Sequence, residues 1–185
     1  SNQLTFDFTN NFKVSNNQQA LDICEALSYL FCKDGISKIN MKIDGKAVSS
    51  FENTTIPLSC ITPNLGINNF ETSTFDLYQT SSVLVYNEKE IAGKTYYIPT
   101  TTRIQNTNQT IDQKVSLLLD HFENNTKVET TKKSQLNDGL LSIYLSSRIL
   151  DNSENISPTL YSRLEKSFLS LPDVSSVHIY INNEL

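Results

Sequence analysis

The residues of this chain that could do chemistry begin with its two histidines, His121 and His178. A metal site needs several ligands that converge on one point, and neither histidine has a cysteine or histidine three or four residues away. His121 falls on the polar side of a predicted helix, and His178 falls in mid-strand, opposite an apolar set of side chains. We therefore expect both to be structural or surface residues, and we predict no metal ligands.

The other reactive residues do not indicate a catalytic centre. A serine or cysteine nucleophile would need a sharp strand-to-helix turn of the G-x-S-x-G type, which the sequence lacks. Asp7 and Asp44 could form a carboxylate pair if their strands are neighbours, but Asp44 stands before Gly45 in a tight-turn dipeptide, and the turn explains it. The glycines are isolated, so there is no glycine-rich phosphate loop. We predict a protein without catalytic residues or a cofactor.

The three cysteines, Cys24, Cys32 and Cys60, have no zinc-site spacing and are too few for a disulfide scaffold. Cys24 and Cys32 lie on one predicted helix, roughly 12 Å apart along its axis, so they cannot bridge each other. At most one of them can pair with Cys60. We predict three free thiols, with Cys24 as a small core residue.

Exposed tyrosines are the best candidates for contacts with a partner. A predicted hairpin carries Tyr86, Tyr96 and Tyr97, and one member of the adjacent pair must face away from the buried side of the sheet. Tyrosine is enriched at protein interfaces. We assign a partner-binding role to these three residues. The alternative is that they cover the rim of the core.

Two stretches of the chain follow one strand-helix-strand plan, and these elements must position any functional residue. In the C-terminal stretch, Leu141 opens an alternating strand, Ser157 and Pro158 favour a helix start, and residues 174–181 alternate again. The helix between the strands has one apolar stripe, which predicts its core-facing side: Leu160, Tyr161, Leu164, Phe168 and Leu171.

The N-terminal stretch repeats this plan in the same order, as a diverged copy would. Its first strand alternates over residues 4–8, and Asn16 or Asn17 is expected to cap the helix. Gly35 stands where a left-handed cap is wanted, before a second strand over residues 36–43. The expected core stripe of the helix is Ala20, Ile23, Cys24, Leu27, Leu30 and Phe31.

The rest of the chain predicts a hairpin and a second helix. Residues 83–86 and 94–104 are expected to be strands around a polar turn at 87–93. A capping-box pattern at 110–113 opens a helix, and the polar, Lys/Thr-rich residues 124–138 predict a mobile loop.

These elements predict an α+β protein of two pseudo-symmetric subdomains, each a small mixed sheet with helices packed on one face. Residues 1–48 form the C-terminal half of a first subdomain, since no β-β-α portion precedes them. Residues 49–81 form a partly extended connector. Residues 82–185 form the second subdomain, with the order β-β-α-β-α-β.

The formal net charge of −5 argues against nucleic acid as a partner, because nucleic acid requires a basic face. No apolar run is long enough to span a membrane. Ser1-Asn2 is typical of the remnant that tag cleavage leaves. We therefore expect membrane attachment only through a trimmed N-terminal anchor.

Several of these segments resemble the GerM domain, a sporulation and spore germination module of Gram-positive bacteria, and their tandem arrangement is similar to that of GerM lipoproteins. The resemblance covers most of residues 82–185 and the latter half of a preceding domain. The residues that carry it are Val83–Tyr86 with the strand returning to Arg103, the helix from Thr110, Leu141–Ser146, Leu160–Leu171 and Val174–Ile181, together with Leu4–Thr9 and Ile36–Lys46 of the first copy. Asn182-Asn183 departs from the usual Asp-Gly ending, which Asp44-Gly45 retains.

The resemblance implies a fold similar to the ring-building motifs of the channel between mother cell and forespore. It implies an extracytoplasmic, lipid-anchored protein that binds and assembles without catalysis, with envelope or sporulation-channel proteins as partners. The family offers no catalytic residues to carry over.

Two other functions remain open from the residues. An envelope-binding module, with peptidoglycan or a small ligand as its target, would show a groove lined by Tyr96, Tyr97 and nearby acids. An enzyme would show a deep pocket holding His121 or His178 beside a carboxylate.

Overall fold

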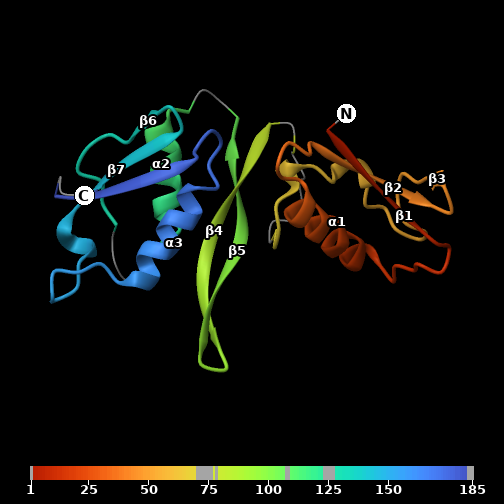
Figure 1. Cartoon of the computed structure of the whole chain (residues 1–185), viewed down its shortest axis with the longest axis horizontal. Coiled ribbons are helices and arrows are strands. Elements are labelled where there is room, and N and C mark those ends of the chain that lie inside the picture. The colour runs from red at the N-terminus through yellow and green to blue at the C-terminus, as the bar shows by residue number, and fades with distance from the viewer. Residues whose placement is uncertain (1, 70–76, 78, 107–108, 123–127, 183–185) are drawn as a thin grey trace. The chain divides into compact units, whose positions relative to one another are not determined.

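A computed structural model of the chain describes residues 2–69, 77, 79–106, 109–122 and 128–182 (Figure 1). The chain divides into two compact units, Ser1–Tyr78 and Gln79–Leu185, and each has its own hydrophobic core. Among the described residues, no helix combines the length and the apolar composition that a membrane span requires.

The first unit places one helix on a three-stranded sheet. Its elements are β1 (Gln3–Phe8), α1 (Asn17–Phe31), β2 (Lys38–Ile43) and β3 (Lys46–Ala47), followed by two short 3₁₀ helices, η1 (Leu58–Cys60) and η2 (Pro63–Leu65). Strand β2 is central: it pairs with β1 in parallel and with β3 antiparallel.

The predicted N-cap of α1 and the Asp44-Gly45 turn are confirmed, whereas the predicted Gly35 cap is wrong. The side chain of Asn16 accepts the Gln19 N–H at 2.9 Å and caps α1. Asp44 and Gly45 both have positive φ, 47° and 77°, in the turn that joins β2 to β3. Gly35 has a φ of 86°, but it follows the helix end at Phe31 by a short turn and does not cap it directly.

The buried stripe of α1 differs from the prediction at the end of the helix. Ala20 and Cys24 are fully buried as expected, whereas Leu30 and Phe31 are 52% and 39% exposed. Two polar residues take part in the stripe because their polar atoms are paired. The Ser28 hydroxyl donates to the Thr62 carbonyl, and Glu25 accepts N–H groups from the segment that follows η2.

Much of the segment that the sequence presents as a connector, 49–81, belongs to the core of the first unit. The side chains of Phe51, Leu58, Ile61 and Leu65 are almost fully buried there against α1 and β2. Pro57 and Pro63 stand at the starts of the tight 3₁₀ turns η1 and η2, which let closely spaced apolar residues face inward. Residues 70–76 and 78 of this segment fall outside the described residues.

The second unit combines a hairpin, two helices and a three-stranded sheet. Its elements are β4 (Thr80–Ile91), β5 (Lys94–Gln105), α2 (Ile111–Asp120), β6 (Gln135–Asn137), β7 (Leu140–Leu145), α3 (Pro158–Phe168) and β8 (Ser176–Ile181), with a 3₁₀ turn, η3 (Ser147–Ile149), after β7. Strand β7 is central, antiparallel to β6 and parallel to β8. Thr110 and Gln113 form the predicted capping box of α2.

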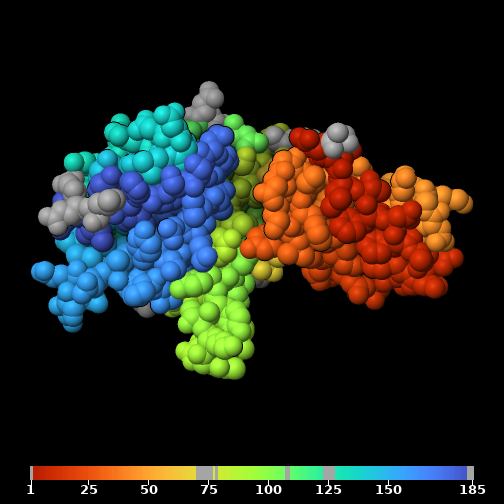
Figure 2. Space-filling view, viewed as in Figure 1, coloured from red at the N-terminus to blue at the C-terminus, as the bar shows by residue number. Residues whose placement is uncertain are grey.

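The prediction of a polar turn at 87–93 is wrong. Strand β4 continues to Ile91, and Ala92 and Gly93 form the turn between β4 and β5. Cross-strand pairing extends through the polar residues, because side chains near the tip of a hairpin can remain exposed while the backbone stays paired. The outer half of the hairpin is exposed, and Figures 1 and 2 show it standing out from the rest of the second unit.

The loop expected over 124–138 is also ordered in its second half. Val128 and Ser134 are buried, and β6 occupies Gln135–Asn137 at the edge of the sheet. The first residues of the predicted loop, 124–127, lie outside the described residues. Polar composition concealed β6 because an edge strand has one exposed side and needs few apolar residues.

Helices α2 and α3 cover one face of the β6-β7-β8 sheet and enclose the second core (Figure 1). The buried ends of β4 and β5 complete it through Val83, Val85 and Ile104. The predicted α+β fold with small mixed sheets is therefore confirmed.

Candidate interaction surfaces

The three tyrosines predicted to bind a partner lie on the hairpin in two different environments. Tyr96 is 46% exposed near the tip. Tyr97 is half-buried, and the Lys166 ammonium lies 5.7 Å from its ring centroid. Tyr86 is half-buried too, and its backbone contacts α3. Only Tyr96 stands well exposed, and the binding role of all three remains a prediction.

The outer edge of β4 is covered by polar side chains of α3 and of the turn that follows it. The Tyr86 N–H donates to Ser167 Oγ at 2.9 Å, and the Leu84 N–H donates to Ser170 Oγ at 2.8 Å. Arg163 Nε donates to the Tyr86 carbonyl at 3.0 Å. These hydroxyl and guanidinium groups satisfy backbone groups that an open edge would offer to another strand.

The open face of the β6-β7-β8 sheet carries an aromatic cluster that sequence reasoning missed. The rings of Tyr144 and Tyr180 stack with centroids 5.0 Å apart, and the ring of His178 meets Tyr180 edge-on. The Lys132 ammonium lies 5.4 Å from the Tyr144 centroid. The register pairs Tyr144 with Tyr180, which sequence alternation alone could not show.

His121 and His178 lie on different elements of the second unit. His121 is the C-cap of α2, and its Nε2 lies 3.1 Å from Thr102 Oγ1. No group of three His, Cys, Asp or Glu residues within the described part of the chain is placed to hold a metal ion.

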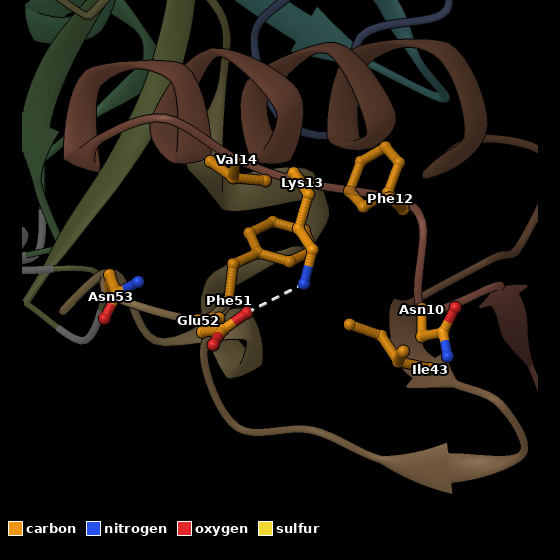
Figure 3. A pocket seen from close by; sticks show the side chains of 8 residues that line it. All are labelled: Asn10, Phe12, Lys13, Val14, Ile43, Phe51, Glu52 and Asn53. Atoms are coloured by element: carbon orange, nitrogen blue, oxygen red, sulfur yellow. Dashed lines mark hydrogen bonds and ion pairs between the residues drawn. The ribbon is translucent and has the colours of Figure 1, made fainter.

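A small pocket lies beside the sheet of the first unit (Figure 3). It has a volume of about 230 Å³, and Phe12, Val14 and Phe51 contribute apolar walls near Ile43 at the end of β2. The Lys13 ammonium and the Glu52 carboxylate form an ion pair of 2.9 Å at this pocket. Both side chains are about 70% exposed, so the pair adds little stability. It does show that the loop after β1 and the segment around Glu52 carry complementary charges at their contact.

A wider groove of about 720 Å³ lies beside β8 in the second unit. Its apolar lining comes from Leu150 and Ile156 of the loop after β7, Tyr161 of α3, and Ile179 and Ile181 of β8. Two acids of that loop, Asp151 and Glu154, stand at it as well. Asp151 is fixed there because its Oδ1 accepts the N–H groups of Ser153 and Asn155 at 2.8 and 3.0 Å.

Two of the cysteine thiols contact each other in the core of the first unit. Cys24 on α1 and Cys60 of η1 are both buried, and Cys24 is the one that meets Cys60. The hydrogen bond with the Cys60 thiol, together with burial, raises the pKa of Cys24. Burial also raises the pKa of Cys32, which is half-buried. All three are free thiols, as predicted.

We expect Cys24 to resist alkylation in the native protein. A raised pKa leaves less thiolate at any given pH, and burial blocks access, so both effects slow the reaction. Iodoacetamide labelling at pH 8, read by peptide mass spectrometry, should modify Cys32 before Cys24. All three should react in 6 M guanidinium chloride. Rapid native labelling of Cys24 would show that the first core opens easily.

The comparisons with known proteins point in one direction. No family model matches the sequence. The chain is 25% identical over 195 aligned residues to the spore germination protein GerM of Bacillus subtilis (strain 168), an alignment that covers 96% of this chain and 53% of that protein. The chain therefore spans about half the length of this curated relative.

The fold is similar to a solved structure, the tandem GerMN domains of the sporulation protein GerM from Bacillus subtilis. The TM-score is 0.82 at 21% identity, and the match covers 99% of this chain and 68% of that chain. At this identity the likeness establishes the fold alone.

Proposed function

We propose that this chain, whose sequence and fold are similar to those of GerM, is a GerM-domain protein that acts in sporulation. It binds other proteins and helps to assemble or stabilise a complex in the envelope of the spore-forming cell. The match to a spore germination protein over nearly the whole chain carries the proposal. We further propose an extracytoplasmic, membrane-anchored protein that acts between mother cell and forespore without catalysis.

The surfaces of the second unit support a binding role. The exposed half of the β4–β5 hairpin offers Tyr96, an aromatic side chain of the type enriched at interfaces. The groove beside β8 offers apolar side chains next to a sheet edge with which no described strand pairs. Both features expose apolar surface in a form that another protein can cover.

Deletion of the gene in its native host tests the proposal. We expect the count of heat-resistant spores to fall by at least about tenfold while vegetative growth stays normal, and a copy of the gene at another locus should restore it. Normal sporulation in the deletion strain would leave the family assignment as a statement about fold alone.

The aromatic cluster on the open sheet face favours a second candidate, peptidoglycan binding, because the apolar C–H faces of sugar rings pack on aromatic side chains. Co-sedimentation with purified cell-wall sacculi tests it. If peptidoglycan is the target, the protein should sediment, and Tyr180→Ala should release it. If assembly with proteins is the function, the protein should stay in the supernatant.

A further inference from the structure

The two units treat the same sheet edge differently. By their place in the repeat, β1, α1 and β2 of the first unit correspond to β7, α3 and β8 of the second. Both strand pairs are parallel with the same register, so Asp7 opposite Lys42 corresponds to Tyr144 opposite Tyr180. Strand β8 is therefore the counterpart of β2, and the first unit shows what this edge accepts.

In the first unit the outer edge of β2 is covered by the chain itself. The Ile39 N–H donates to the Ile61 carbonyl at 3.0 Å, and the Met41 carbonyl accepts the Val48 N–H at 3.2 Å. The covering segment, 46–61, also adds strand β3 next to the end of β2. Backbone groups along this edge are thereby satisfied.

The corresponding backbone groups of β8 face outward. Ser176 N–H donates to Gly139 O and Asn182 N–H donates to Leu145 O, so even-numbered residues bond toward β7. Alternation along a parallel strand then directs the odd-numbered residues to the other side. These residues are Val177, Ile179 and Ile181. Across the described residues, no strand pairs with this side of β8.

The pocket beside β2 is partly filled by the covering segment, whereas the groove beside β8 is larger. In the first unit, Phe51 and Glu52 of the covering segment wall the pocket beside Ile43, and its volume is about 230 Å³ (Figure 3). The groove beside Ile181, the counterpart of Ile43, has a volume of about 720 Å³ and an apolar lining. It has room for side chains such as those that segment 46–61 inserts into the first unit.

The charged side chains at the two pockets predict the charge of a segment that binds along β8. In the first unit, Lys13 of the loop after β1 pairs with Glu52 of the covering segment. The counterpart loop after β7 is acidic instead, with Asp151 and Glu154 at the groove. A segment that lies along β8 in the same way would place a lysine or arginine where the first unit has Glu52.

We propose that the outer edge of β8 and the adjoining groove bind an extended segment of a partner protein, which adds an antiparallel strand to the sheet. The segment carries apolar side chains that fill the groove and a basic residue that meets Asp151 and Glu154. This mode of recognition is strand addition, in which backbone hydrogen bonds supply affinity and side-chain pockets supply specificity. The inference rests on the proposed assembly function and names the surface that performs it.

A peptide drawn from the chain itself tests the surface. The probe is residues 46–61 with Cys60→Ser, in one version with Glu52 and in a second with Glu52→Lys. We expect the lysine version to bind the protein roughly three- to tenfold more tightly, because it exchanges a repulsion at Asp151 and Glu154 for an attraction. Equal affinity of the two peptides, or no binding of either, would overturn the proposed charge match or the site.

Matched protein variants locate the binding. Glu154→Lys should weaken binding of the lysine peptide by roughly three- to tenfold, whereas Glu90→Lys, the same change on the exposed hairpin, should leave affinity within about twofold. Both positions are exposed, so neither variant should disturb folding. Equal effects of the two variants would show that the peptide responds only to net charge.

Hydrogen exchange identifies what occupies the outer edge of β8. The measurement uses the full-length protein purified from its native host. The amides of Val177 and Ile179 should exchange quickly without peptide and slowly with it, while the Ile39 amide stays protected throughout. If Val177 and Ile179 are already protected in dilute protein, the chain covers its own edge. If protection rises only with protein concentration, a second copy covers it. Either result overturns the proposed partner.

A spore count separates this inference from the proposed function. If Ile181→Lys and Glu154→Lys both restore normal sporulation to the deletion strain, the protein acts in sporulation through another surface and the β8 inference fails alone. If the deletion strain itself sporulates normally, the proposed function fails, whatever the peptide does. We expect the lysine substitutions to reduce spore yield and Glu90→Lys to retain it.

Discussion

Replacement of Phe168 by alanine is expected to lower the free energy of unfolding of the second unit by about 3–5 kcal/mol. Phe168 is fully buried at the end of α3, where it packs against the sheet and α2. Removal of its ring loses the transfer free energy of a large apolar side chain and leaves a cavity that the surrounding helices and strands cannot close completely.

Urea denaturation followed by circular dichroism measures this effect, and Leu169→Ala provides a matched control. Leu169 is the next residue and is 41% exposed, so its truncation should cost less than about 1 kcal/mol. If the two variants unfold at the same urea concentration, Phe168 does not occupy the centre of the second core. Hydrogen exchange at Ile143 should follow the same order, since this residue lies in the same core.

Replacement of Glu25 by alanine should cost the first unit about 2–4 kcal/mol, because it removes a buried carboxylate that accepts several hydrogen bonds. Glu25 is only 5% exposed on α1. One carboxylate oxygen accepts the Asn68 N–H at 2.8 Å, and the other accepts the Asn69 side-chain amide at 2.8 Å. The carboxylate thus ties α1 to the segment after η2, and its loss should release that segment.

Asp22→Ala is the control for Glu25, since Asp22 is an exposed acid on the same helix whose side chain accepts a hydrogen bond from Gln18. Its removal should change stability by less than about 0.5 kcal/mol. Glu25→Gln separates charge from shape: it preserves one acceptor oxygen but turns an amide donor toward other donors, so it should lie between the wild type and Glu25→Ala. A neutral effect of Glu25→Ala would contradict a structural role for these hydrogen bonds.

Local sequence patterns were sufficient to predict most regular elements, because their signals depend on near neighbours. The alternation around Leu141 and the helical spacing through Phe168 predicted β7 and α3, and the structure confirms both. Thr110 and Asn16 cap their helices as their types suggest. The recurrence of one strand-helix-strand order predicted two related units, since equal patterns bury equal faces.

The errors arose where polar residues belong to regular or buried structure. Residues 87–91 continue β4 because cross-strand pairing holds the backbone regardless of polarity. Glu25 and Ser28 are buried on α1 because acceptors and donors from distant segments pair with them. Local sequence patterns contain no information on those distant partners. Apolar spacing therefore predicted that Leu30 and Phe31, and not Glu25 and Ser28, are buried on α1.

The sequence by itself determined the elements, their repeated order, the absence of familiar catalytic motifs and the family resemblance. Only the tertiary structure decided that Cys24 meets Cys60 and that Tyr144 stacks on Tyr180. It also decided that segment 46–61 covers the outer edge of β2, whereas no described strand pairs with the outer edge of β8. The physical reason is the sequence separation of the residues that interact. Elements follow from residues a few positions apart, whereas side-chain neighbours and strand edges depend on which distant segments fold together.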